Sequence, residues 1–206
     1  MKEDYQPFFL GTRFCILPPG LTPPAGDQIN LIMNRGAFGS GEHETTRSCL
    51  EILENFQCGG QEKIEKILDL GSGTGILSIA MLLLGAGRAW CVDIEESAVQ
   101  SCKENCRLNG VDERVTHVCG TVDGLQEGGF DLVLANIHGD VLLAVASDLV
   151  SKSRPGARLL LSGMLWEYNF DVRQKYQRSG CELMKHRMLE EYSTLLFRVT
   201  NDSRVT

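Results

Sequence analysis

The chain has 206 residues, of which 43% are hydrophobic and 23% charged, and its formal net charge is −7 at pH 7. This length and composition are typical of one globular domain that buries a core without disulfide or metal support. The negative charge argues against a broad, sequence-independent nucleic-acid surface, because such a surface needs clustered Lys and Arg side chains. The start, Met1-Lys2-Glu3-Asp4, is unlike the basic start of a signal peptide, so we expect a cytoplasmic protein with no membrane association.

Eight cysteines are scattered along the chain, which is typical of a reducing compartment. No pair has Cys-x-x-Cys spacing, so we expect no zinc knuckle and no metal site. Cys102 and Cys106 lie four residues apart in a helical stretch, where two small packed thiols are the simpler interpretation. Cys91 and Cys119 fall in expected strands and are predicted to lie in the core.

The N-terminal segment, residues 1–28, contains five of the six prolines. Such a segment is typical of an arm or of edge strands rather than of a domain core. Residues 29–33 are a short strand candidate, and we expect the main domain to cover residues 29–206.

A glycine-rich loop over residues 36–46 precedes a helix with apolar residues at helical spacing up to Phe56. We expect Thr45 or Thr46 to be the N-cap of this helix. Amides at a helix start and threonine hydroxyls can hold an anion such as a carboxylate, so the loop is a candidate binding segment.

A second glycine loop carries the strongest signal. An apolar strand over 66–70 leads into Gly71, Gly73 and Gly75, and a helix over 75–84 follows. Glycines let the backbone approach a ligand closely, and the helix start then presents free N–H groups to it. A dinucleotide fingerprint needs its third glycine at position 76, which is Ile76, so NAD binding is disfavoured.

An acid near the end of the next strand supports a nucleoside site. Asp93 lies near the carboxyl end of the strand expected over 88–94, 18 residues after Gly75. A carboxylate there can accept from both ribose hydroxyls. The Asp-x-Gly-x-Gly-x-Gly segment from Asp69 to Gly75, followed by this acid, resembles motif I of the class I S-adenosylmethionine (SAM) methyltransferases.

The remainder of the chain alternates strands and helices. This order predicts a mostly parallel sheet with helices on both faces, and two final strands without a crossover helix predict a C-terminal hairpin with one antiparallel strand. The fold class is therefore α/β, a Rossmann-like sandwich around a seven-stranded sheet. The expected helices cover 97–109, 140–151 and 166–178, and the expected strands 115–119, 130–135, 158–162, 181–188 and 193–199.

From about Pro18 to Val199 the chain resembles the catalytic domain of the PrmA family, bacterial methyltransferases of the ribosomal stalk-base protein. Two departures are visible: Glu42 and Glu44 flank His43, and only about 28 residues precede the domain where the family has a substrate-recognition domain. Five motifs in order carry the resemblance: the loop from Ala37 to Thr46, Ile76-Leu77, Asp93, Ala135-Asn136-Ile137, and Leu161-Ser162-Gly163-Met164-Leu165.

The resemblance implies a set of SAM contacts and two catalytic candidates, Asn136 and His43. The side-chain carbonyl of Asn136 could accept an amine N–H and aim the nitrogen lone pair at the methyl group, whereas His43 could equally be structural. Asp123 is a further candidate near the adenine. The expected SAM contacts are Phe38, Thr45, Thr46, Asp69, Gly71, Gly73, Gly75, Asp93, Ile94, Thr121 and Asn136.

The leading hypothesis is SAM-dependent methylation of amines on a protein, either lysine side chains or an N-terminal amine of the stalk-base protein. Nucleic-acid N-methyltransferases typically carry Asn/Asp-Pro-Pro-Tyr/Phe, whereas this chain reads Asn136-Ile137-His138-Gly139. A small-molecule methyltransferase and a non-catalytic SAM-binding module stay open as alternatives. Trp90 and Trp166 are expected to be core or sheet-covering residues, and His117, His138 and His186 surface or local-structure residues.

Overall fold

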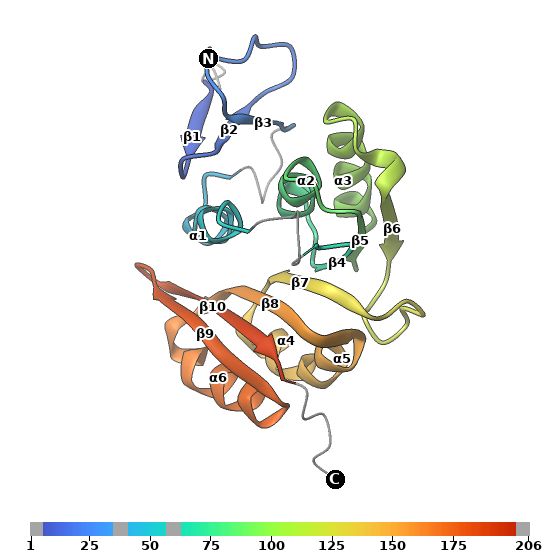
Figure 1. Cartoon of the computed structure of the whole chain (residues 1–206), viewed down its shortest axis with the longest axis vertical. Coiled ribbons are helices and arrows are strands. Elements are labelled where there is room, and N and C mark those ends of the chain that lie inside the picture. The colour runs from blue at the N-terminus through green and yellow to red at the C-terminus, as the bar shows by residue number, and fades with distance from the viewer. Residues whose placement is uncertain (1–5, 35–40, 57–62, 201–206) are drawn as a thin grey trace.

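The computed structural model describes residues 6–34, 41–56 and 63–200. A seven-stranded sheet of order β6-β5-β4-β7-β8-β10-β9 forms its centre (Figure 1). All neighbours are parallel except that β10 runs antiparallel to both β8 and β9, which confirms the predicted sheet. The strands are β4 (Lys66–Leu70), β5 (Arg88–Asp93), β6 (Val115–Cys119), β7 (Phe130–Asn136), β8 (Ser153–Leu165), β9 (Cys181–Met188) and β10 (Tyr192–Val199).

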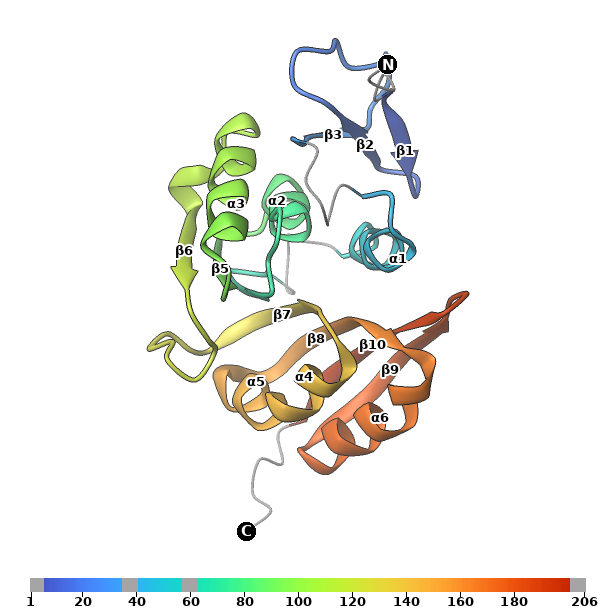
Figure 2. The same ribbon diagram turned by 180° about the vertical axis from the view of Figure 1, so that it is seen from behind.

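Helices cover both faces of this sheet (Figures 1 and 2). The first three pack on one face and the last three on the other, and each face has its own cluster of buried side chains. Two 3₁₀ turns, η2 (Asp112–Arg114) and η3 (Trp166–Tyr168), join these elements. The helices are α1 (Glu44–Leu53), α2 (Ile76–Leu83) and α3 (Glu96–Leu108), then α4 (Gly139–Ala144), α5 (Ala146–Lys152) and α6 (Asn169–Arg178).

The burial of α2 and α3 follows from their sequences. Residues 76–82 of α2 are all buried, because this nearly all-apolar helix lies between the sheet and its neighbours. In contrast, α3 buries one stripe, Val99, Cys102, Asn105 and Cys106, and leaves its charged residues outside. The buried α2 holds the glycine loop at the carboxyl end of β4.

The N-terminal residues form a second, three-stranded sheet of β1 (Phe8–Leu10), β2 (Phe14–Leu17) and β3 (Ile29–Ile32). Its apolar side chains, among them Phe14 and Leu31, join the buried cluster of α1 and α2. Asn109 at the end of α3 ties this sheet down, because its amide accepts from Ile32 N (2.9 Å) and donates to Ile32 O (2.7 Å).

Several predicted elements differ from those observed; the helix expected over 166–178, for example, begins as η3, and α6 starts only at Asn169. The helix expected over 140–151 is divided into α4 and α5 at Val145. The strand expected over 158–162 is longer and covers Ser153–Leu165. Pro155 is tolerated within it because the pairing with β7 has a bulge there, so the proline nitrogen, which has no hydrogen to donate, is not required to pair with β7.

Two side chains expected in the core are exposed. Cys119 lies at the end of the edge strand β6, and Trp166, which is 60% exposed, follows the last residue of β8 in η3. Cys91 and Trp90 lie further inside the sheet: Cys91 is buried, and Trp90 packs edge-on against Phe130 at 5.5 Å. The described helices include none with the length and apolar character needed to span a bilayer.

Candidate functional site

The glycine loop after β4 is held against the end of β5. Gly71 N and Ser72 N both donate to Val92 O, at 2.8 and 3.2 Å. The φ angles of Gly71, Gly73 and Gly75 are +68°, +53° and +79°, in the region that disfavours residues with a Cβ.

The three glycines face different surroundings. A Cβ added to Gly71 would lie 2.3 Å from Ile137, and one added to Gly75 would lie 2.6 Å from the sulfur of Cys102. A Cβ at Gly73 would meet nothing within 4 Å among the described residues. Gly71 and Gly75 therefore allow close packing inside the protein, whereas Gly73 presents its backbone to open space, where a ligand can approach.

Asp69 supports this loop from inside the protein. Its side chain is 2% exposed, and Oδ2 accepts from Ser78 Oγ at 2.8 Å, at the start of α2. Burial raises the pKa of Asp69 to about 7, although the Ser78 hydroxyl and amide oppose the rise. The carboxyl group is therefore bonded to α2 inside the protein.

The raised pKa of Asp69 predicts a pH-dependent stability. Between its ordinary value near 3.8 and about 7, the unfolded chain has released this proton while the folded protein keeps it. Stability from this group is therefore full below pH 3.8 and is lost as pH rises through 7. The Asn in the Asp69→Asn variant cannot titrate, so the variant does not lose this stability. The unfolding free energy of the variant minus that of the wild type should therefore increase between pH 4 and pH 8, by on the order of 1–4 kcal/mol.

Urea denaturation at a series of pH values measures this difference. The exposed Asp171→Asn is the matched control, because it makes the same substitution at the protein surface. A difference for Asp69→Asn that stays constant with pH would show that folding does not raise the pKa of Asp69.

Asp93 stands at the end of β5, beside the glycine loop. Its Oδ2 accepts from Gly73 N at 2.9 Å, and its Oδ1 accepts from Glu95 N at 3.1 Å. These bonds fix the carboxylate while leaving lone pairs on both oxygens, since a carboxylate can accept about four hydrogen bonds. Ile94 is 73% exposed, and the loop carrying the exposed Thr121 is tied back through Gly120 N to Asp93 O at 2.8 Å.

The start of α1 corrects the predicted cap. His43, not Thr45 or Thr46, is the N-cap: its Nδ1 accepts from Thr45 N at 3.3 Å and lies 2.8 Å from Thr45 Oγ1. Both threonines instead lie buried within the first turn. The ring of His43 also packs edge-on against Tyr192 of β10, with centroids 5.1 Å apart. Histidine is not among the usual cap residues, which is why the sequence pattern missed it.

Asn136 ends β7 and meets α1. Its Nδ2 donates to Thr46 Oγ1 at 3.4 Å, across 90 residues of sequence. Its Oδ1 is buried and has no hydrogen-bond partner within the described part of the chain. A buried carbonyl oxygen without a donor is costly, so this atom is available to an N–H group from a ligand. Because Ile137 packs on Gly71, Asn136 lies next to the glycine loop.

Two contacts of α1 were not foreseen from the sequence. The carboxylate of Glu44 accepts from the backbone N of Glu190 at 3.0 Å and of Glu191 at 3.3 Å, in the turn between β9 and β10. Glu51 pairs with Arg187 of β9 at 2.8 Å. These contacts hold the start of α1, and with it Thr46, over the sheet. Phe38, also expected at the site, lies outside the described residues.

Known sequences are similar to almost the whole chain. The model of the ribosomal protein L11 methyltransferase (PrmA) family matches residues 1–200. The ribosomal protein L11 methyltransferase of Pelobacter propionicus is 38% identical over 200 residues, which cover 96% of this chain and 64% of that protein. The chain thus spans less than two thirds of that relative's length.

Solved structures agree on the fold. A ribosomal protein L11 methylase from Lactobacillus delbrueckii subsp. bulgaricus superposes with a TM-score of 0.84 at 24% identity, covering 96% of this chain and 100% of that one. SMU.776, solved as a complex with SAH, superposes with a TM-score of 0.63 at 13% identity, covering 77% of this chain and 50% of that one. The family resemblance predicted from five motifs is confirmed, and the chain belongs to the ribosomal protein L11 methyltransferase (PrmA) family.

Proposed function

We propose that this protein is a SAM-dependent methyltransferase that methylates amine nitrogens of a protein, namely ribosomal protein L11, the substrate in its relatives' names. The observation that carries the proposal is the buried, unpaired Oδ1 of Asn136 at the carboxyl end of β7, next in the chain to Ile137, which packs on Gly71. An open α/β sheet binds its ligands at this edge. We assign catalysis to residues 29–206, with 1–28 as an N-terminal arm, and expect the reaction to take place in the cytoplasm.

The described residues fit SAM. Gly73 leaves its backbone open to a ligand, and the start of α2 provides a partial positive charge. Asp93 keeps acceptor positions for two ribose hydroxyls, and the exposed Ile94 and Thr121 lie on the side where an adenine would follow. The Thr46 hydroxyl, already in contact with Asn136, would face the amino-acid end. The other proposed contacts are Phe38, Thr45, Gly71 and Gly75, with Asp69 acting through α2.

The bound cofactor supplies a methyl group already activated on a sulfonium. What the protein must add is alignment and exclusion of water, because the displacement is in line. Asn136 Oδ1 would accept an N–H of the neutral amine and so aim its lone pair along the transfer axis. Asn136 cannot act as a base, so the proton that the nitrogen loses goes to water.

His43 is assigned to positioning rather than to proton transfer. Its Nδ1 is engaged with Thr45, and its ring packs against Tyr192. These contacts fix the first turn of α1, which carries Thr46. His43 therefore acts on the reaction through Thr46.

Two measurements test the proposal in sequence. Isothermal titration first establishes whether the protein binds SAM. Intact-mass spectrometry then follows unmodified L11 with SAM, both as the isolated protein and within a ribosomal-protein extract. We expect whole methyl additions to L11 that depend on SAM. Binding without any addition to L11 would overturn the substrate, and absence of SAM binding would overturn the enzymatic assignment itself.

A further inference from the structure

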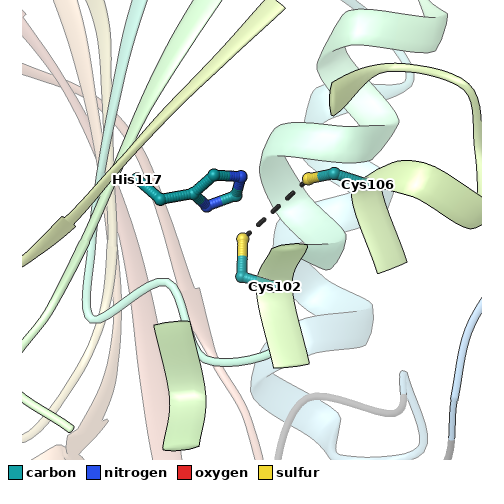
Figure 3. Close-up of side chains that lie close together, drawn as sticks. All are labelled: Cys102, Cys106 and His117. Carbon is teal, nitrogen blue, oxygen red and sulfur yellow. Dashed lines mark hydrogen bonds between the residues drawn. The ribbon is translucent and has the colours of Figure 1, made fainter. Parts of the chain in front are cut away.

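A cluster of three metal-ligating side chains lies between α3 and β6, away from the open side of the glycine loop. Cys102 and Cys106 stand one turn apart on α3, both 0% exposed, and the half-buried His117 comes from the facing strand β6. Figure 3 shows the imidazole beside the two sulfurs. The sulfurs are 4.0 Å apart, and the three ligand atoms all lie within 4.8 Å of one another.

These separations are close to those of a tetrahedral zinc site. With Zn–S near 2.3 Å and Zn–N near 2.0–2.1 Å, two sulfurs are about 3.8 Å apart and a sulfur and a nitrogen about 3.6 Å. The 4.0 Å between the sulfurs of Cys102 and Cys106 therefore needs almost no adjustment. A shift of about 1 Å at the imidazole of His117 would bring its nitrogen to the ideal distance from the sulfurs. Rotation of this one side chain can supply such a shift.

The cluster contains a buried ring nitrogen without a hydrogen-bond partner, and its side chains are of the types that bind metals. His117 Nδ1 is buried and has no hydrogen-bond partner in the parts of the chain that the structure describes, although buried ring nitrogens are normally paired. Two cysteine sulfurs and an imidazole nitrogen are among the donors that bind zinc in proteins. A thiolate is the form that binds a metal.

A surface cavity borders this cluster at His117. It has a volume of about 160 Å³ and is lined by Lys103, Arg107, Asp112 and His117. A cavity of this size admits water, and the carboxylate of Asp112 borders it. Lys103 and Arg107 oppose an approaching cation at long range, whereas Asp112 attracts it.

We propose that Cys102, Cys106 and His117 bind one zinc ion, with the fourth position taken by water or by Asp112 from the cavity. The site joins α3 to β6, so the ion adds a cross-link between a helix and the edge strand of the sheet. Since Cys102 also packs behind Gly75, the ion lies on the inner side of the glycine loop. The site departs from the expectation of no metal, which the absence of Cys-x-x-Cys spacing had suggested.

Cobalt(II) is the probe, because thiolate ligands give it an intense charge-transfer absorption. The reduced, chelator-treated full chain is titrated with Co²⁺ and then with Zn²⁺. We expect one equivalent of Co²⁺ with the thiolate band, displaced by Zn²⁺, and a rise in Tm on adding Zn²⁺. His117→Ala should weaken Co²⁺ binding by roughly a hundredfold or more, since loss of a group that only orients a ligand already costs about 10–100-fold.

Cys106→Ser should weaken Co²⁺ binding and reduce the charge-transfer band, whereas Cys181→Ala, at a buried cysteine on β9, should keep both the band and the affinity. The His117 variant changes a half-buried residue and should fold even if a cysteine variant does not. A wild type without the band, or Co²⁺ affinity that stays at the wild-type level in both the Cys106 and His117 variants, overturns the site.

Discussion

Asp93→Ala is expected to weaken SAM binding by about 100-fold or more. Two hydrogen bonds from ribose hydroxyls to a carboxylate are each worth roughly 1.5–3 kcal/mol, and about 1.4 kcal/mol corresponds to a factor of ten. The substitution also removes the acceptor of Gly73 N (2.9 Å), so the glycine loop loses its link to the end of β5. Isothermal titration of SAM into each purified variant measures the effect.

The control is Glu96→Ala, which removes the same charge from an exposed position three residues away. Its affinity for SAM should stay within about threefold of the wild type, because exposed charges contribute little. Asp93→Asn should fall between the two, since the amide keeps one acceptor oxygen. An Asp93→Ala protein that binds SAM like the wild type would remove Asp93 from the ribose.

Asn136→Ala is expected to lower kcat on L11 by about 100-fold while changing SAM affinity by only a few-fold. The side chain contributes a hydrogen bond to the amine that matters for alignment, and misplacement by about 1 Å costs roughly 100-fold in rate. It also removes the contact from Nδ2 to Thr46 Oγ1, but that bond is 3.4 Å long and contributes little. Initial rates and SAM titration on the same preparation separate the two effects.

Asn55→Ala is the matched control for this substitution. Asn55 is exposed at the end of α1, where its side chain donates to Glu51 O at 2.9 Å. Its kcat should equal that of the wild type. If Asn136→Ala keeps full kcat, Asn136 does not align the amine. If kcat and SAM affinity fall together, Asn136 acts on cofactor binding instead.

Much of the fold could be predicted from local patterns. The apolar strand before Gly71 and the apolar helix after Gly75 have their own periodicities, and the bounds of β4 and β6 agree with prediction. The edge strand position of Cys119 and the exposure of Trp166 could not be predicted. Both depend on whether another helix or strand packs against the residue. A propensity describes a residue and its close neighbours, not what packs against them.

For the site, too, local patterns could be predicted and contacts between distant segments could not. By itself the sequence determined the α/β class, the glycine loop, Asp93 and the family, because these depend on residues that are close along the chain. Only the tertiary structure decided that Asn136 meets Thr46, that Glu44 binds the β9–β10 turn, and that Cys102 and Cys106 face His117. Those contacts join segments that the sheet order brings together, and no spacing within a single segment encodes them.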